Sequence, residues 1–142
     1  MSKQSIVRVR HVMQTDVDIV DGMLTVAEAV RDMKYPRTQT LIIDKRDEND
    51  EYGIVVFNDL AQMVLAPARA PDRINLYELM SKPVIHVDPE MDIRFCTRLF
   101  AKFGLSRAPV LDKGMIVGLV SYGDIVIRGM FTGLSEAQGK QT

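Results

Sequence analysis

An internal duplication constrains the fold of this chain more than any other feature of its sequence. A shift of 67 places aligns the two halves and matches Val12 with Leu79 and Asp21 with Asp88. Later pairs match at a shift of 65, because the first half contains a longer charged loop, KRDENDEYG. Loops absorb such insertions without a change of fold. The chain therefore predicts two copies of one structural unit.

Each copy predicts the element order β-α-β-β-α. The expected strands are 17–20, 40–44 and 53–57 in the first copy, and 84–87, 108–112 and 115–120 in the second. The first helix of each copy follows an N-cap signal, which is Thr25 with Glu28 in one copy and Asp92 in the other. Pro36 and Gly104 are expected to end these two helices. The closing helices are expected at about 59–65 and 124–131.

Neither copy buries enough apolar surface to fold alone, so the two sheets are expected to pack together as one α+β module with pseudo-twofold symmetry. We expect repeat 1 at 7–66, a linker at 67–77 and repeat 2 at 78–131. A short helix capped by Asn75 is expected where the linker ends. The polar ends, 1–6 and 132–142, are expected to be loose.

Charge and cysteine content exclude several classes of partner. The 18 Lys and Arg and 19 Asp and Glu leave a net charge of −1, so no cationic field favours nucleic acid or an anionic membrane. The apolar runs are far shorter than the roughly 20 residues that cross a bilayer. The single cysteine, Cys96, and a start without the apolar core of a secretory signal predict a cytoplasmic protein.

The segment Gly118–Asp124, GLVSYGD, carries the clearest chemical signal. It lies where a strand leads into a helix, and backbone N–H groups at such a junction can hold a phosphate beside the Ser121 hydroxyl. The Asp124 carboxylate can accept hydrogen bonds from the vicinal hydroxyls of a ribose. Ser121 and Asp124 also have the spacing of a capping box, so a purely structural role is the alternative interpretation.

Three segments of the second copy, VIHVDPEMD, GLSRAPVLDKG and GLVSYGDIV, together resemble the tandem CBS domains of a Bateman module. The resemblance covers about 7–130. It implies two tandem β-α-β-β-α CBS repeats with a regulatory adenine nucleotide, AMP, ADP or ATP, bound in the cleft between them. S-adenosylmethionine and NAD are occasional ligands of such modules. The resemblance places the ribose on Asp124 and a phosphate near Ser121.

Further site residues follow from the same resemblance. Arg107 is expected to direct its guanidinium at the phosphates, although a solvated surface arginine is the alternative. The stretch 83–85 is expected to pack against the adenine. The predicted nucleotide site comprises Pro83, Val84, Ile85, Ser106, Arg107, Ala108, Pro109, Ser121 and Asp124.

The first copy departs from this pattern and predicts a second, weaker site. Asp59 keeps the acidic residue, but Val56 replaces the hydroxyl and Gln39 aligns with Arg107. A cleft shared between repeats would let Arg107 serve either site. The weaker site comprises Val17, Asp18, Gln39 and Asp59, and we expect it to be weak, empty or suited to an uncharged adenosine-like group.

We expect no effector domain beside the two repeats, so the resemblance implies signalling to a separate protein in trans. Exposed helix faces bearing Met63, Met130 and Phe131 are expected to form a homodimer. The alternative is a dimerisation or docking module with a vestigial nucleotide cleft. We expect no catalysis and no required cofactor or metal, because Cys96 lies on the apolar side of its helix and the metal-binding spacings are missing.

Overall fold

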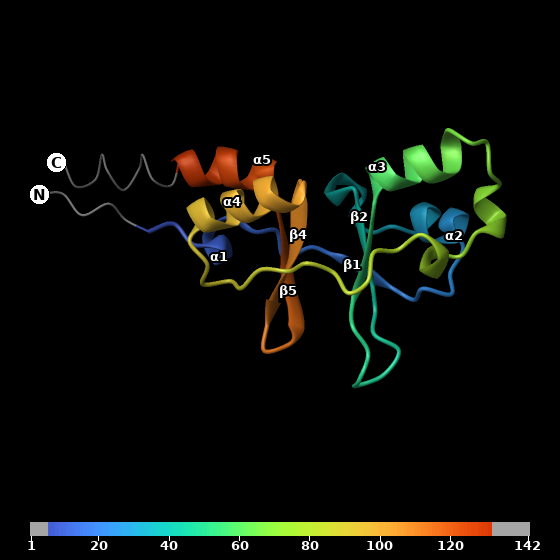
Figure 1. Ribbon diagram of the computed structural model, residues 1–142, viewed down its shortest axis with the longest axis horizontal. Coiled ribbons are helices and arrows are strands. Elements are labelled where there is room, and N and C mark those ends of the chain that lie inside the picture. Colours follow the sequence, from blue (N-terminus) through green and yellow to red (C-terminus); the bar gives the residue numbers. More distant parts are fainter. Residues whose placement is uncertain (1–5, 132–142) are drawn as a thin grey trace, which may run out of the picture. The chain divides into compact units, whose positions relative to one another are not determined.

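The computed structural model describes residues 6–131, which form two compact units (Figure 1). Unit 2 is the continuous stretch 16–84. Unit 1 combines residues 6–15 with residues 85–131, so its chain is interrupted by the whole of unit 2. Residues 1–5 and 132–142, on which the prediction of loose ends mostly falls, lie outside the described residues.

Unit 2 has a three-stranded sheet flanked by helices. Strands β1 (Asp18–Val20) and β2 (Thr40–Ile43) are parallel, and β3 (Gly53–Val56) is antiparallel to β2. Helix α2 (Val26–Arg31) follows β1, while α3 (Phe57–Leu60) follows β3 and continues as the wider turn η2 (Ala61–Leu65). Three short 3₁₀ turns are η1 (Pro36–Thr38), η3 (Pro71–Arg73) and η4 (Leu76–Glu78). The element order predicted for the first copy is confirmed.

The capping box of α2 is confirmed, but the predicted end of this helix is wrong. Thr25 N–H donates to Glu28 Oε1 at 3.0 Å, and Glu28 N–H donates to Thr25 Oγ at 3.1 Å. The helix ends at Arg31, several residues before Pro36. The buried Asp18 carboxylate accepts hydrogen bonds from backbone N–H groups 34 and 35, and these bonds hold the chain in a turn before the proline is reached.

Unit 1 has a two-stranded hairpin, β4 (Arg107–Asp112) and β5 (Met115–Ser121), covered by helices. These are α1 (Val9–Val12), α4 (Ile93–Phe103) and α5 (Tyr122–Asp124), the last continuing as η5 (Ile125–Gly129). Both predicted ends of α4 are confirmed. The Asp92 side chain accepts from Arg94 N–H, and Gly104 adopts the left-handed conformation with φ +65°.

The strand expected at 84–87 is wrong. Val87 makes only an isolated parallel bridge with Val110 of β4, and Val84 N–H donates to Tyr52 O in unit 2. The chain passes from one compact unit to the other between Val84 and Ile85. These residues therefore do not lie along one sheet edge, and the second copy lacks the third strand of the first.

The segment that begins each repeat packs on the strands of the other repeat. Residues 6–15 join unit 1, where Gln14 forms an antiparallel bridge with Leu119 of β5. Ser81, which the 67-place shift aligns with Gln14, forms the same bridge with Ile54 of β3. We call residues 6–15 and 74–84 the lead segments. The division of the sequence into repeats at 7–66 and 78–131 stays a prediction, because compact units and sequence repeats differ.

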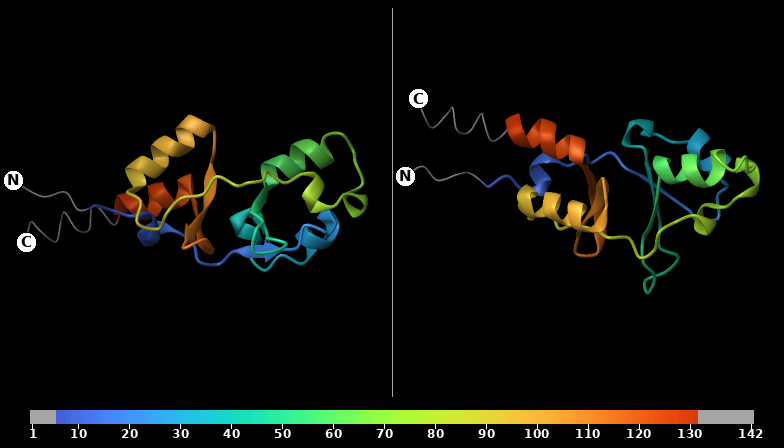
Figure 2. Two further views of the ribbon diagram at one scale, coloured as in Figure 1. Left: turned by 60° about the horizontal axis from the view of Figure 1, so that its bottom comes forward. Right: turned by 45° about the horizontal axis from the view of Figure 1, so that its top comes forward.

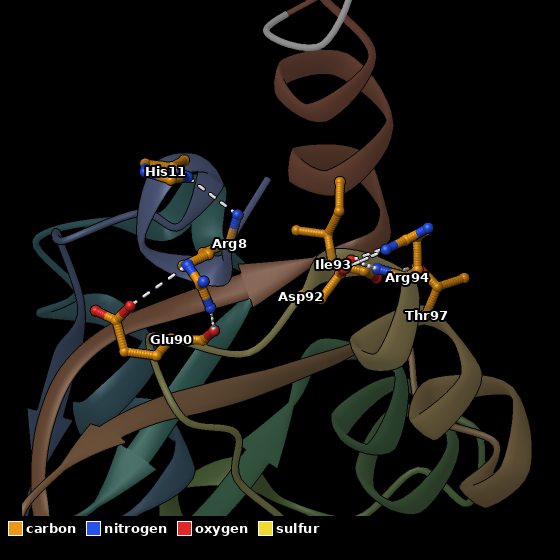
Figure 3. A network of polar contacts seen from close by, with 7 residues as sticks. All are labelled: Arg8, His11, Glu90, Asp92, Ile93, Arg94 and Thr97. Atoms are coloured by element: carbon orange, nitrogen blue, oxygen red, sulfur yellow. Dashed lines mark hydrogen bonds and ion pairs between the residues drawn. The ribbon is translucent and has the colours of Figure 1, made fainter. Parts of the chain in front are cut away.

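A polar network ties the first lead segment to the loop before α4 (Figure 3). Arg8 Nη1 donates to Glu90 O at 2.6 Å, and Arg10 Nε donates to Glu90 Oε1 at 2.9 Å. Val9 N–H donates to Met91 O at 2.8 Å, while Val9 and Val12 are fully buried. The lead segment is thus an integral part of unit 1, as the two views of Figure 2 also show.

No helix among residues 6–131 combines the length and apolar character required to cross a membrane.

Candidate functional site

Four predicted site residues come together at one end of the β4–β5 hairpin. The register pairs Arg107 directly with Ser121. Tyr122 N–H donates to Ser106 O at 3.1 Å, which brings the start of α5 against the residue before β4. Asp124 lies in the first turn of α5. The strand register therefore gathers Ser106, Arg107, Ser121 and Asp124, although their binding role stays a prediction.

Ser121 and Asp124 form the capping box that the sequence allows. Ser121 N–H and Oγ–H both donate to Asp124 Oδ2 at 3.0 Å, and Asp124 N–H donates to Ser121 Oγ at 3.2 Å. The other carboxylate oxygen, Oδ1, accepts one hydrogen bond, from Gln14 Nε2 at 3.1 Å. Both side chains are half-buried. A carboxylate oxygen can accept two hydrogen bonds, so Oδ1 retains capacity for a further donor.

Gln14 is a site residue that the sequence did not indicate. It reaches Asp124 because the first lead segment bridges to Leu119 of β5 and so brings residue 14 beside the start of α5. The only sequence signal is a polar residue directly after the buried Val12 and the half-buried Met13. That signal does not show which unit the lead segment joins.

Arg107 is half-buried and close enough to Asp124 for the charges of the two side chains to interact. Burial lowers the pKa of the Arg107 guanidinium, and the charge of Asp124 acts in the opposite direction. An arginine remains charged at any physiological pH despite such a shift. The site therefore holds a cation and an anion within electrostatic reach of each other, which suits a ligand with both anionic oxygens and hydroxyl donors.

The residues predicted to surround the adenine are divided between the two units. Ala108 and Pro109 are buried in unit 1, where Pro109 O accepts from Val87 N–H. Ile85 is 40% exposed, also in unit 1. Pro83 and Val84 belong to unit 2. The predicted contact of these five residues with a base stays a prediction.

The residues of the predicted weaker site have visible structural roles. Asp18 is 6% exposed, and its two oxygens accept from Lys34 N–H at 2.9 Å and Tyr35 N–H at 3.0 Å. Gln39 has a φ of +54°, and its backbone carbonyl oxygen accepts a hydrogen bond from Phe57 N–H at 3.0 Å. Asp59 lies half-buried in the first turn of α3.

The preceding N-cap of α3, Val56, makes no side-chain cap, so the hydroxyl and carboxylate pair of unit 1 has no counterpart here. Val17, the remaining member of the weaker site, lies half-buried directly before β1.

Cys96 is fully buried in the core of unit 1, as its place on the apolar side of α4 predicted. Desolvation raises the pKa of its thiol to about 11, so the sulfur is protonated at neutral pH. Within residues 6–131, no three His, Cys, Asp or Glu side chains cluster as metal ligands would.

Unit 2 contains an apolar groove between α2, α3 and η2, with a volume of ≈ 590 Å³. Its lining includes Val30, Ala61 and Leu65. None of the predicted nucleotide-site residues lines this groove. The groove and the hairpin site of unit 1 are therefore different places on the chain.

Comparison with known proteins identifies the family. The CBS domain model matches residues 76–129. A hexameric CBS-CP12 protein from bloom-forming cyanobacteria is 35% identical, with a TM-score of 0.84 over 89% of this chain and 73% of that one. The CBS domain pair of protein MJ0100, solved with 5′-methylthioadenosine and S-adenosyl-L-methionine, shares the fold at 23% identity and a TM-score of 0.73, covering 91% of this chain and 98% of that one.

A relative from Methanopyrus kandleri, MK0525, is 31% identical over 61% of this chain. The chain spans 43% of the length of that relative. The duplication, the mixed α+β units and these matches agree, and the chain belongs to the CBS domain family.

Proposed function

We propose that the chain is a regulatory, non-catalytic module that binds an adenine nucleotide through the hairpin site of unit 1 and signals to a separate protein. The observation that carries this proposal is the Asp124 carboxylate, which lies half-buried within electrostatic reach of Arg107 and retains acceptor capacity on Oδ1. The fold is shared with the MJ0100 domain pair, whose bound ligands both contain adenosine. We propose the same ligand class for this chain.

Binding of a ribose exchanges existing hydrogen bonds for new ones. Asp124 Oδ1 accepts from Gln14 and can accept a ribose hydroxyl in addition, or in place of Gln14. Oδ2 already accepts two donors from Ser121 and remains committed to the helix cap. The ribose therefore contacts Oδ1, and Gln14 is the side chain that adjusts to it.

Phosphate recognition depends mainly on Arg107. The single hydroxyl proton of Ser121 is donated to Asp124, so Ser121 must give up that bond before it can donate to a phosphate oxygen. The guanidinium of Arg107 has several N–H donors in a fork that matches the geometry of phosphate oxygens. We therefore expect Arg107 to set the preference for a charged nucleotide over an uncharged adenosine derivative.

The site in the first copy is proposed to be the weaker one. Asp18 is buried and each of its oxygens accepts a backbone N–H, Val56 lacks a hydroxyl, and Gln39 replaces the arginine. The absence of the hydroxyl and the arginine from the first copy also favours the second candidate function, which is a docking module that binds no nucleotide at all.

Self-association and a cytoplasmic location complete the proposal. The cyanobacterial relative is a hexamer, and this chain exposes Met63, Met130 and Phe131 on helices at 41%, 60% and 66%. Contiguous exposed apolar side chains mark protein interfaces, and Met130 and Phe131 are neighbours on one helix. We propose a homodimer as the smallest assembly.

Isothermal titration with AMP, ADP, ATP, NAD and S-adenosylmethionine tests the nucleotide proposal. We expect saturable binding of one of them, weakened by at least about tenfold in Asp124→Asn through loss of a charge-assisted hydrogen bond. The matched control is Asp59→Asn at the aligned position of the first copy, which should leave the affinity unchanged. Circular dichroism verifies that both variants fold.

Absence of binding by all five ligands, in protein free of copurified nucleotide, would contradict the sensor proposal and favour the docking module. Equal losses in the two variants would show that the asymmetry between the copies is wrong.

A further inference from the structure

The charged loop that lengthens the first copy is folded in a definite way by its own hydrogen bonds. Asn49 N–H donates to Asp47 Oδ1 at 2.8 Å, and Asp50 N–H donates to Asp47 O at 3.2 Å. Arg46 donates to Asp50 Oδ2 through its backbone N–H at 2.9 Å and through Nε at 3.1 Å. In the second copy, residues 113–114 are enough to join the corresponding strands β4 and β5. A connection from β2 to β3 therefore does not by itself require so long a loop.

The Asp50 side chain of this loop is mostly buried and pairs with Lys82. The Asp50 side chain is 9% exposed, and its Oδ1 lies 2.5 Å from Nζ of Lys82, whose side chain is 21% exposed. Hydrogen bonds from Lys82 and Arg46 hold the pKa of the Asp50 carboxyl well below its usual range, so Asp50 is ionised at neutral pH. Exposed ion pairs contribute little because water and salt screen them, but this pair is largely removed from water. The Asp50–Lys82 ion pair therefore attaches the loop to the second lead segment.

Lys82 lies between two backbone attachments of the second lead segment. On one side of it, Ser81 and Ile54 exchange backbone hydrogen bonds at 2.9 and 3.0 Å. On the other side, Val84 N–H donates to the backbone oxygen of the buried Tyr52 at 3.1 Å. Val84 is the last residue of unit 2, and a segment end that is held by few contacts opens readily. The ion pair at Lys82 therefore decides how firmly the end of this segment is held.

The two residues that follow Lys82 belong to the predicted nucleotide site. Pro83 and Val84 are expected to pack against the adenine, and Pro83 is exposed while Val84 is half-buried. Residues that must become ordered when a ligand binds reduce the affinity, because their ordering costs free energy. An attachment directly before Pro83 lowers that cost, since it orders the segment before the ligand arrives.

The first lead segment lacks the chemistry for such an attachment. The 67-place shift aligns Thr15 with Lys82 and Val17 with Val84, and Val17 belongs to the predicted weaker site. The Thr15 hydroxyl carries no charge, and residues 113–114, a lysine and a glycine, offer no carboxylate. The loop ion pair therefore supports only the segment of the site that is predicted to be the stronger one.

We propose that Asp50 is a positioning residue for nucleotide binding: its ion pair with Lys82 holds residues 83 and 84 in the conformation that receives the base. The proposal rests on the nucleotide binding proposed above and deepens it. Asp50 acts through Lys82 and does not itself contact the ligand. The inserted loop of the first copy thereby contributes to the affinity of the nucleotide site.

Isothermal titration with AMP and ATP tests the positioning role. Asp50→Asn keeps the size of the side chain and removes the charge that attracts Lys82. We expect the affinity to fall about three- to tenfold, and by the same factor for both nucleotides, because they share the base. Electrostatics alone predicts the opposite sign, since the loss of a negative charge favours an anionic ligand.

Asp47→Asn is the matched control, because it removes the same charge from the same loop. The Asp47 side chain is exposed and accepts from Asn49 N–H, so this variant leaves the Asp50–Lys82 ion pair in place. It should not weaken binding. Lys82→Arg keeps the ion pair and should retain the parent affinity, whereas Lys82→Met should weaken binding as Asp50→Asn does.

Hydrogen exchange at the Val84 amide reports the position of the segment without any ligand. In Asp50→Asn this amide should exchange at least about tenfold faster than in the parent chain, because the segment end opens more often. The amides of β2 should keep their parent rates, which shows that unit 2 remains folded. Asp47→Asn should leave the exchange of Val84 unchanged.

An unchanged exchange rate of Val84 in Asp50→Asn would overturn the proposal. Unchanged or tighter nucleotide binding by Asp50→Asn would also overturn it, and in that case the proposed function would stand because the parent chain still binds. A parent chain that binds neither nucleotide would overturn the proposed function, and with it the positioning role. Faster exchange of Val84 would then leave Asp50 with a structural role alone.

Discussion

Ser121 and Asp124 hydrogen-bond to each other at the start of α5. These hydrogen bonds explain why one motif suits both a helix cap and the proposed binding site. The cap fixes the Asp124 side chain through Oδ2 and leaves Oδ1 directed to Gln14. A carboxylate held in this way loses little side-chain entropy when a ligand hydroxyl arrives. The two interpretations of the motif are therefore compatible, and the ligand affinity decides between sensor and docking module.

The thiol of Cys96 provides a prediction about reactivity. Burial raises its pKa from the ordinary 9.0 to about 11, so at pH 8 the folded chain holds roughly 100-fold less thiolate than the unfolded chain. We expect maleimide labelling of the native protein to be at least that much slower than labelling in denaturant. An engineered thiol at Met115, which is 61% exposed at the start of β5, should react quickly in a Met115→Cys sample and serves as the control.

The linked effect on stability has a definite sign. A raised thiol pKa means that the folded state holds the proton more tightly than the unfolded state. The resulting contribution to the free energy of unfolding is fully present below pH 9 and is lost as the pH rises towards 11. Labelling of folded Cys96 as fast as the exposed control would show that the core of unit 1 opens freely.

Local residue signals predicted local structure well. Thr25 with Glu28, Asp92 and Gly104 act within a few residues of themselves, and all of them cap the helices as expected. The contact of Gln14 with Asp124 joins residues that are 110 positions apart. Hydrophobic periodicity and capping carry no information about such a pairing, which explains why this part of the site was missed.

At the scale of elements, the glycines of β3 and β5 illustrate how the two copies differ. A Cβ on Gly118 would lie 2.7 Å from the backbone oxygen of Gln14 and 2.8 Å from Met13 Sδ. A Cβ on the aligned Gly53 would meet Met80 Sδ at 2.9 Å, and a flexible side chain can move. The lead segment therefore approaches β5 too closely for any side chain at position 118.

We predict that Gly118→Ala lowers the free energy of unfolding by about 2 to 3 kcal/mol, because the alanine must push the lead segment away from β5. Gly53→Ala, its matched control, should cost less than about 1 kcal/mol. Urea denaturation followed by circular dichroism measures both. Equal losses would mean that Gln14 does not hold the position that the bridge with Leu119 gives it.

Elements that depend on distant segments were predicted less well than elements that depend on neighbours. The three strands of unit 2 and the β4–β5 hairpin were predicted to within about two residues, because their apolar runs are bounded by turns. The strand at 84–87 has the same β-branched composition, yet its chain crosses between compact units. Helix α2 ends early because the backbone N–H groups of Lys34 and Tyr35 donate hydrogen bonds to the buried Asp18 carboxylate. Composition alone predicts neither effect.

At the scale of the whole molecule, unit 1 depends on its first lead segment. Val9 and Val12 are fully buried and Val7 is 8% exposed, so this segment contributes three side chains to the core. Burial of a valine contributes about 1.5 to 3 kcal/mol, and three of them approach the total stability of an ordinary domain.

We therefore predict that a chain lacking residues 1–15 keeps unit 2 folded but loses unit 1. Hydrogen exchange should show protected amides in β2 and none in β4 and β5. A synthetic peptide of residues 1–15 added in trans should restore that protection, because it supplies the missing valines and the bridge to Leu119. Full protection of β4 in the truncated chain would contradict the proposed dependence.

The interruption of unit 1 by unit 2 also sets an order for folding during synthesis. Residues 6–15 leave the ribosome before unit 2, but their partners, residues 85–131, are made after it. Unit 2 is continuous, so it can fold while the remainder of the chain is still being translated. The hairpin site beside Asp124 consequently forms late among the described residues. The proposed nucleotide site of unit 1 cannot form until residues 107–124 have emerged and packed against the first lead segment.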